Sequence, residues 1–190
     1  MKLGILKLLS AAMLLTAVGC AETPEINIVP NPESLVQGKG VFKIAGAPVC
    51  TGEGLDAESI RWANTFAQRL TLVTGKKSEV ITAPKGKCVE FVSNLALAAE
   101  EYKLEVTKNN VKIEASSAAG FRYATQTIGQ MLPAAYFGKT AAAGESWVLP
   151  VVSIQDKPRF AYRGMHMDVG RHFFSMDEVK KYLDIRQCTR

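Results

Sequence analysis

Histidine is nearly absent from this chain. Its two copies, His166 and His172, both lie near the carboxyl end of the 190 residues. Residues 24–150 also contain no glycine-rich phosphate loop and no cluster of carboxylates. No CxxC pair and no His/Cys spacing of the kind that holds zinc occurs in the sequence. We therefore expect no metal and no cofactor, and we expect any catalytic chemistry to lie after residue 150.

Runs of basic residues are absent too. The formal net charge is +5, but Lys2 and Lys7 belong to an N-terminal segment without acids, and the other basic residues are scattered. No Lys/Arg run interleaved with aromatic residues indicates a nucleic-acid surface. The sequence therefore predicts no nucleic-acid partner, and it argues against a basic domain that binds polyanions.

Cysteine is scarce, with four copies. Cys50 and Cys88 fall in the middle of the chain and could pair, because exported proteins form disulfides. Two cysteines in one domain do not make a disulfide framework, however. Unpaired and partly buried thiols are the favoured alternative, because free cysteine is among the most buried residue types.

No apolar run is long enough to be a stable membrane-spanning anchor. The N-terminal run "LLSAAMLLTAV" is too short, but it follows Lys2 and Lys7 and precedes the small residues of "AVGC", as in an export signal. The segment resembles a bacterial lipobox, whose cysteine is lipidated and becomes the new N-terminus. We expect a lipoprotein signal peptide over residues 1–20, a lipid on Cys20, and an exported protein anchored to a bacterial membrane, in the periplasm or at the cell surface. A plain secretory signal with an incidental cysteine is the alternative.

Residues 24–150 show the hydrophobic periodicities of a small α+β domain. Short strands are expected in "INIVPNPESL", "GVFKIAG" and "KCVEFVSN", and alternation around Asn109-Asn110 predicts a hairpin in "YKLEVTKNNVKIEAS". Helical spacing predicts one helix over Leu55–Thr74, which Gly75 ends, and a second over "SAAGFRYATQTIGQML", which Pro133 ends. The apolar stripe of the first helix consists of Ile60, Ala63, Phe66, Ala67, Leu70 and Val73. The order β-β-α-β-β-β-α describes an antiparallel sheet with two helices on one face.

A second unit is expected over residues 151–190. Asp156 and Pro158 indicate a turn, and Arg163 to Val169 is a candidate buried strand. Ser175 and Glu178 fit a Ser-x-x-Glu capping box that opens a helix. Strand, loop and helix together predict one β/α unit.

This second unit carries the densest polar chemistry of the chain. Arg163 begins the expected strand, and Asp168, Arg171 and His172 follow at its carboxyl end, where β/α units place active-site residues. One interpretation is a polar pocket whose arginine fork binds paired hydroxyls or a carboxylate. In the structural alternative, Asp168 and Arg171 form an ion pair that fixes the loop, while His172 caps or packs. On the residues alone the structural alternative is favoured, because structural ion pairs are common.

The stretch "PRFAYRGMHMDVGRHFFSMDEVKKYLDI" resembles the opening of the catalytic barrel of glycoside hydrolase family 20, the β-N-acetylhexosaminidases. The shared pattern is Arg-Phe, Arg-Gly, an apolar pair, Asp, Arg-His-Phe, and then a helix with Val-Lys and Asp. "AAGFRYATQTIGQMLP" and "VVSIQDKPRFAYRG" resemble the non-catalytic domain that precedes that barrel. The resemblance covers about residues 24–185, and it implies an accessory domain over 24–150 followed by the start of an incomplete (β/α)8 barrel over 151–190.

The resemblance also implies roles for the polar residues. Arg163 would bind hydroxyls of the terminal sugar, and Asp168, Arg171 and His172 would support the pocket wall. The family's mechanism is substrate-assisted and retaining: the acetamido oxygen of the sugar attacks the anomeric carbon, while an Asp-Glu pair orients it and supplies the general acid. The expected partners are glycans with a terminal N-acetylhexosamine.

Two features depart from the family pattern. The adjacent pair Asp177-Glu178 opens a helix and does not match the catalytic pair. A β/α barrel needs about 250 residues, far more than residues 151–190 provide. We therefore expect a truncated chain that is inactive alone and holds no catalytic residue of its own. The alternative from another class is a non-catalytic surface lipoprotein that binds a glycan or a partner through its α+β domain.

Replacing Cys20 with serine is expected to release the protein from the membrane fraction, because the variant cannot carry acyl chains on sulfur. Each buried acyl CH₂ contributes about 0.8 kcal/mol, so several chains anchor firmly. The measurement is the amount of protein that stays with membranes after a carbonate wash. Retention of the Cys20→Ser variant at the wild-type level would show that the lipobox interpretation is wrong.

Overall fold

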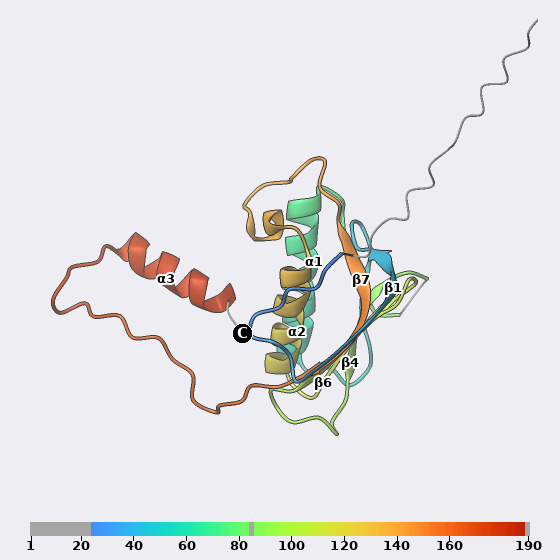
Figure 1. The fold of residues 1–190 in the computed structure, drawn as a ribbon, viewed down its shortest axis with the longest axis horizontal. Helices are drawn as coiled ribbons and strands as arrows, with labels where there is room; N and C mark the ends of the chain where they lie inside the picture. Colours follow the sequence, from blue (N-terminus) through green and yellow to red (C-terminus); the bar gives the residue numbers. More distant parts are fainter. Residues whose placement is uncertain (1–23, 84–85, 189–190) are drawn as a thin grey trace, which may run out of the picture.

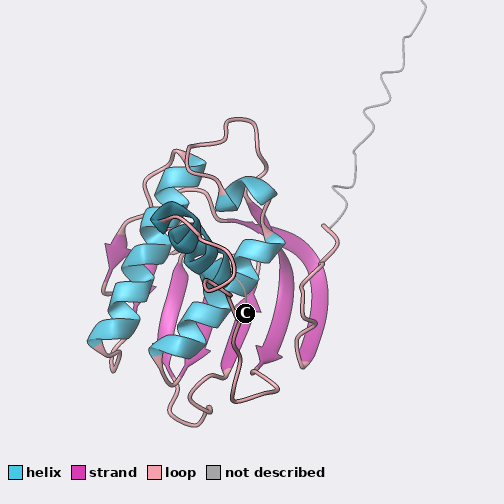
Figure 2. Cartoon of the chain, turned by 90° about the vertical axis from the view of Figure 1, so that its left-hand side faces the viewer, coloured by secondary structure: helices cyan, strands magenta, loops and turns pink. Residues whose placement is uncertain are grey.

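The computed structural model describes residues 24–83 and 86–188, so the expected signal peptide and Cys20 lie outside the described residues. A seven-stranded sheet has the order β1-β7-β5-β6-β4-β2-β3, and helices α1 and α2 cover one of its faces (Figures 1 and 2). The strands are β1 (Ser34–Lys43), β2 (Val49–Thr51), β3 (Val80–Ile81), β4 (Val89–Ser93), β5 (Tyr102–Val106), β6 (Val111–Ala115) and β7 (Val148–Asp156). The helices are α1 (Ala57–Thr74), α2 (Ala118–Met131), the short 3₁₀ helix η1 (Ala134–Phe137) and α3 (Met176–Cys188).

The sheet is mixed, so the expectation of a purely antiparallel sheet is wrong. Strands β1, β7, β5 and β6 pair antiparallel, whereas β6, β4, β2 and β3 pair parallel. Helix α1 lies between β2 and β3 in the chain and is the crossover that parallel pairing requires. Strand β5 pairs with β6 on the side away from β4, which leaves β4 and β6 pointing in the same direction.

The hairpin is confirmed residue by residue, whereas the strand expected at the N-terminal end is wrong. Leu104 lies opposite Ile113 in the β5–β6 ladder, and buried residues alternate with more exposed ones along both strands. Residues 24–33 form no strand. Ile28 from this segment is nevertheless buried in the core, and the first strand begins only at Ser34.

Both predicted helices of the α+β domain are confirmed. The Asp56 carboxylate caps α1 by accepting a hydrogen bond from the Ser59 N–H at 2.7 Å. Gly75 ends the helix in a left-handed conformation with φ 66°, which glycine adopts without a steric penalty. Of the expected apolar stripe, all residues are buried except Ile60, which is 40% exposed.

The core lies between the sheet and the two helices. Phe91 of β4 stands between Phe66 of α1 and Phe121 of α2, with ring centres 6.2 Å and 5.2 Å apart. Burying a large apolar side chain contributes about 1.5–3 kcal/mol. The three rings therefore join both helices to the sheet near the middle of the domain.

Strand β7 crosses the boundary that the sequence suggested between residues 150 and 151. It extends to Asp156 and lies between two partners, with Ile154 opposite both Leu35 of β1 and Leu104 of β5. Leu149, Val152 and Ile154 are all buried. The sheet therefore needs residues well beyond 150, because without β7 the strand β1 would have no neighbour.

After β7 the chain leaves the sheet. The strand expected over Arg163–Val169 does not form, and residues 157–175 contain no helix or strand. The capping box is confirmed: Ser175 N donates to Glu178 Oε2 at 2.7 Å, and Glu178 N donates to Ser175 Oγ at 3.3 Å. Helix α3 follows on the same side of the sheet as α1 and α2 (Figure 1). In the described part of the chain, no helix combines the length and apolar character needed to cross a membrane.

Cys50 and Cys88 are unpaired and buried, as the favoured alternative predicted. Cys50 lies on β2 and Cys88 directly precedes β4. The Cys88 thiol donates a weak hydrogen bond to Asn110 Oδ1 at 3.4 Å. Burial is the main cause that raises the pKa of the Cys88 thiol to about 12, with a further contribution from a hydrogen bond with Cys50.

A chain of residues 24–158 is expected to fold alone and to melt in a single cooperative transition, because it retains the complete sheet and both covering helices. A chain of residues 24–150 should lack this transition, because it loses most of the strand between β1 and β5. Circular dichroism during heating and the dispersion of amide signals measure the difference. Equal melting of the two chains would show that β7 is dispensable.

Gly120→Ala is expected to destabilise the domain by about 1–3 kcal/mol through overpacking. A Cβ on this residue of α2 would lie 2.5 Å from the Glu101 carbonyl oxygen and 2.8 Å from the Ala115 Cβ. Gly170→Ala is the matched control, because its nearest new contact is an ordinary 3.5 Å to Asp168 Oδ1. Urea unfolding of both variants tests this close approach, and equal midpoints would contradict it.

Candidate functional site

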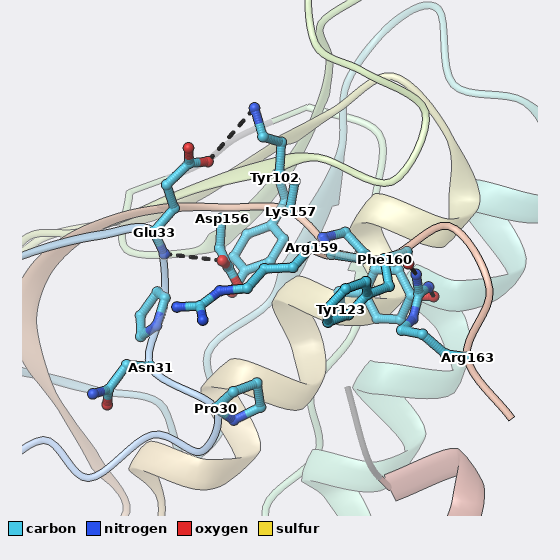
Figure 3. A pocket seen from close by; sticks show the side chains of 12 residues that line it. Pro30, Asn31, Glu33, Tyr102, Tyr123, Asp156, Lys157, Arg159, Phe160 and Arg163 are labelled. Carbon is cyan, nitrogen blue, oxygen red and sulfur yellow. Dashed lines mark hydrogen bonds and ion pairs between the residues drawn. The ribbon is translucent and has the colours of Figure 1, made fainter. Parts of the chain in front are cut away.

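Arg163 lies against the α+β domain, held by two residues from different elements. Glu100 belongs to the turn that precedes β5, and Tyr123 lies on α2. Arg163 itself belongs to the irregular segment that follows β7, and its side chain extends beside Tyr123 (Figure 3). Sequence reasoning placed Arg163 at the start of a barrel strand, whereas in the structure it lies on the accessory domain.

The guanidinium makes four hydrogen bonds through its two terminal nitrogens. Nη2 donates to Glu100 Oε1 at 2.6 Å and to the Tyr123 hydroxyl at 2.7 Å. Nη1 donates to Glu100 Oε2 at 3.5 Å and to the backbone carbonyl of Phe160. The Tyr123 hydroxyl in turn donates to Glu100 Oε1 at 2.9 Å. Arg163 Cζ also lies 5.6 Å from the centre of the Tyr123 ring, within cation–π range.

These contacts favour the charged forms of both partners. The hydrogen bond from Arg163 is the largest cause that lowers the pKa of the Glu100 carboxyl, and partial burial opposes it. The hydrogen bond to Glu100 likewise raises the pKa of Arg163. Because the Glu100 pKa is lowered in the folded state, the pair stabilises the fold above the ordinary glutamate pKa, and this contribution is lost as the pH falls through the lowered value.

A pocket of about 580 Å³ adjoins this cluster (Figure 3). Three segments line it: residues 30–33 from the N-terminal end, Tyr102 and Tyr123 from the domain, and residues 156–160 with Arg163 from the chain after β7. Asp156 forms part of its wall, where its Oδ1 accepts a hydrogen bond from Glu33 N at 3.0 Å. The Tyr102 hydroxyl lies 2.6 Å from Thr127 Oγ1 and 3.5 Å from Asp156 Oδ2. The polar side chains of Tyr102 and Asp156 in this wall are therefore already hydrogen-bonded.

Arg159 differs from Arg163, although both line the same pocket. Within the described residues its guanidinium makes no hydrogen bond or ion pair. The two side chains extend in different directions from the segment that carries them (Figure 3). The pocket thus combines Arg163, whose terminal nitrogens are hydrogen-bonded to the protein, with Arg159, whose guanidinium is available to solvent.

The other predicted site residues lie away from Arg163. Arg171 Nε forms an ion pair with Asp168 Oδ2 at 3.0 Å, and Asp168 Oδ1 accepts from the backbone N–H groups of Gly170 and Arg171. His172 packs edge-on against Phe174, with ring centres 5.6 Å apart. No described hydrogen bond or ion pair links any of the three to Arg163. This arrangement is the loop-fixing ion pair of the structural alternative; a supporting role toward a sugar stays a prediction.

Glu100, Tyr123 and Arg159 were missed by the sequence reasoning. Glu100 and Arg163 are 63 positions apart, and no periodicity connects them. The signals that were available were weak: a Glu100-Glu101 pair directly before a strand, and a tyrosine beside Arg122 on a helix whose apolar stripe it does not share. Among the described residues, no group of three or more His, Cys, Asp or Glu is placed to hold a metal ion.

Solved structures share this fold. A β-N-acetylhexosaminidase from Streptomyces coelicolor matches with a TM-score of 0.72 and 32% identity, over 81% of this chain and 31% of that chain. A variant β-hexosaminidase from Streptomyces plicatus, solved with the product GlcNAc, matches with a TM-score of 0.74 and 30% identity, over 88% of this chain and 34% of that chain.

Curated proteins agree with these structures. A β-hexosaminidase of Porphyromonas gingivalis is 31% identical over 165 residues, which are 84% of this chain and 21% of the relative. A β-N-acetylhexosaminidase of Cellulomonas fimi is 28% identical over 85% of this chain and 32% of its own length. The chain therefore spans about a fifth to a third of the length of the relatives it matches.

Family models divide the chain at the end of β7. Residues 25–157 match domain 2 of glycosyl hydrolase family 20, and residues 160–188 match the start of the family's catalytic domain. The first match covers well over half of the chain and coincides with the sheet and its two covering helices. On this combination of fold, sequence identity and family match, the chain belongs to glycosyl hydrolase family 20.

Proposed function

We propose that the protein carrying this chain is a β-N-acetylhexosaminidase that removes terminal N-acetylhexosamine residues from glycans. The observation that carries the proposal is the match of residues 160–188 to the family's catalytic domain, directly after the match of residues 25–157 to its domain 2. Relatives that match both parts bear the names β-hexosaminidase and β-N-acetylhexosaminidase. The present chain would contribute the accessory domain and the first segment of the catalytic domain.

Arg163 is the residue of this chain proposed to bind the sugar. A guanidinium is planar and offers its donors in a fixed fork, which suits two neighbouring hydroxyls as well as it suits a carboxylate. In this structure the two Nη atoms of Arg163 donate to the two carboxylate oxygens of Glu100, at 2.6 Å and 3.5 Å. This paired contact supports the proposal, because two neighbouring hydroxyls would be bound by the same pair of donors. Asp168, Arg171 and His172 would support the pocket wall once the rest of the catalytic domain surrounds them.

The reaction itself would depend on residues outside this chain. In the substrate-assisted mechanism the acetamido oxygen is the nucleophile, so the protein must supply an orienting carboxylate and a general acid. Asp177 and Glu178 do not fit these roles, because they occupy the first turn of α3 and Glu178 is bound to Ser175. We therefore propose that the 190-residue chain alone has no hydrolytic activity, and that the enzyme works without metal or cofactor.

The proposal includes a place for the enzyme. The N-terminal segment has the order of an export signal with a lipidated Cys20, so the enzyme would be held at a bacterial membrane, in the periplasm or on the cell surface. Anchoring would keep the sugar-releasing domain close to glycans of that compartment.

Arg163→Lys is expected to lower kcat/KM for a chromogenic N-acetylglucosaminide roughly ten- to a hundred-fold, in a protein that continues this chain with the remaining catalytic domain of the Porphyromonas gingivalis relative. An ammonium cannot reproduce the planar fork, and losing hydrogen bonds to a charged group costs about 1.5–3 kcal/mol each. Arg159→Lys is the matched control, because its guanidinium has no partner among the described residues.

Three outcomes would contradict parts of this proposal. A folded parent protein without hydrolysis would remove the proposed activity. Near-normal turnover of Arg163→Lys would remove Arg163 from the sugar site. Hydrolysis by the purified 190-residue chain, abolished by neither variant, would show that the catalytic groups lie elsewhere than proposed.

A further inference from the structure

The segment before β1 is fixed to the domain at several points. The Pro24 carbonyl accepts a hydrogen bond from Gln37 Nε2 of β1 at 3.0 Å. The backbone of Val29 exchanges two hydrogen bonds with the side-chain amide of Gln130, at 2.7 Å and 3.1 Å. In the sequence, three residues separate Cys20 from Pro24. Because an extended chain gains at most about 3.6 Å per residue, a lipid on Cys20 would hold Pro24 within about 15 Å of the lipid-bearing residue.

The chain enters and leaves the domain at different places. Figure 1 shows the first described residues (blue) in the upper half of the sheet, whereas the chain leaves β7 at the lower end of that strand. The match to the catalytic domain begins after this lower end. A lipid anchor and the catalytic part would therefore extend from different sides of the accessory domain.

The end of the sheet at which β7 begins is basic. Five exposed lysines lie there, and within the described residues none of them forms an ion pair or a side-chain hydrogen bond: Lys39, Lys43, Lys76, Lys87 and Lys108. We call these five lysines the basic end.

The basic end brings together lysines from separate elements. Lys108, in the turn of the β5–β6 hairpin, lies against Gly40, which follows Lys39 in the irregular part of β1. Lys43 is the last residue of β1, and it lines a hollow of about 500 Å³ together with Lys76, which follows α1. Lys87 directly precedes Cys88 and β4. The charges therefore form a surface that no single stretch of the sequence contains.

Few carboxylates oppose this surface. Glu79 forms an ion pair with Lys77 at 2.8 Å, which leaves Glu145 beside the hollow and Glu25 beside Pro24. Glu90 and Glu105, on β4 and β5, act on the Lys112 ammonium of β6 and favour its charged form. Five lysines thus face two carboxylates that have no lysine of their own.

Acidic residues gather at the other end of the sheet, where β7 stops. They are Glu33, Glu53, Asp56, Glu58, Glu100, Glu101 and Asp156. Arg61 and Lys157 lie there too, and each forms an ion pair with one of these acids. The domain is therefore polarised along its strands, and its acidic end is the one from which the catalytic part continues.

We propose that the basic end binds the anionic headgroups of the membrane that holds the anchor, so that the accessory domain stands between the lipid surface and the catalytic domain. The orientation rests on the lipidated Cys20 proposed above, whereas the affinity for anionic lipid rests only on the lysines described. Each lysine near an anionic surface strengthens binding roughly fivefold. The short link to the lipid would add to this, because it keeps the basic end at a high effective concentration next to the headgroups.

Vesicle partition measures this surface without the anchor. The chain from Ala21 onward, which keeps every described residue, is mixed at low ionic strength with vesicles of phosphatidylglycerol and phosphatidylcholine in equal parts, and bound protein is separated by centrifugation. We expect Lys39→Gln with Lys108→Gln to lower the partition coefficient roughly ten- to twenty-five-fold, and Lys43→Gln with Lys76→Gln to act alike. Added salt should weaken binding, since the Debye length shrinks to about 8 Å at physiological ionic strength.

Lys103→Gln with Lys157→Gln is the matched control, because it removes the same charge near the end where β7 stops. We expect this pair to leave the partition coefficient almost unchanged. Equal weakening by the control pair would reduce the effect to net charge. That result overturns the proposal, as would equal binding to vesicles of phosphatidylcholine alone or no binding at all. Retention on heparin without vesicle binding would also overturn it, in favour of a polyanionic glycan.

Amine labelling tests the orientation in the lipid-bearing protein. The full chain, produced with its leader in bacteria, is reconstituted in the same vesicles, and mass spectrometry follows the modification of each lysine. We expect Lys39 and Lys108 to react more slowly in vesicles than in nonionic detergent, and Lys157 to react equally in both. Equal protection of all three lysines would overturn the orientation.

The two measurements fail separately from the proposed function. A chain without acyl mass on Cys20 would remove the anchor and the orientation with it, while vesicle partition would still decide whether the basic end binds anionic lipid. Neither measurement uses hydrolysis, so loss of the proposed enzymatic activity would leave both results standing.

Discussion

The position of β7 between β1 and β5 determines where the rest of the chain can go. This strand is the last one along the chain, and it pairs with β1 on one side and with β5 of the hairpin on the other. It ends at Asp156, beside Tyr102 and the end of the sheet nearest to the Glu100 turn. The segment that follows, including Arg163, starts from that edge of the domain because β7 ends there.

The division of the chain follows from the same strand. Domain 2 of the family match ends at residue 157, one residue after β7, and the catalytic match begins at residue 160. At this boundary Lys157 forms an ion pair with Glu33 at 3.7 Å, and Pro158 removes a backbone donor at the point where the sheet stops. The segment that would carry the sugar-binding arginine is thus tethered within a few residues of a rigid sheet.

Local patterns were sufficient for most of the fold. The helices α1 and α2 and the β5–β6 hairpin follow from apolar spacing, caps and turn residues that lie close together in the sequence. The mixed sheet was not predictable in this way, because the pairing of β4 with β6 and of β7 with β1 depends on contacts between distant segments. The expected barrel strand at Arg163–Val169 shows the limit most clearly: a barrel strand needs neighbours on both sides, and none of the described strands pairs with these residues. The contact between Glu100, Tyr123 and Arg163 was not predictable either, since these residues come from a turn, a helix and an irregular segment that are distant in the sequence.

The two buried thiols of the domain, Cys50 and Cys88, are expected to react slowly with disulfides and oxidants. Attack on a disulfide or an oxidant requires the thiolate, and burial, which raises the pKa of the Cys88 thiol to about 12, keeps this thiol protonated at neutral pH. Cys50 and Cys88 are also fully shielded from solvent, so an oxidant must wait for the sheet to open. On the proposed export route, this pair would pass through an oxidising compartment in the reduced state. The folded sheet would then protect the thiols by kinetics, with no need for a reducing system outside the cell.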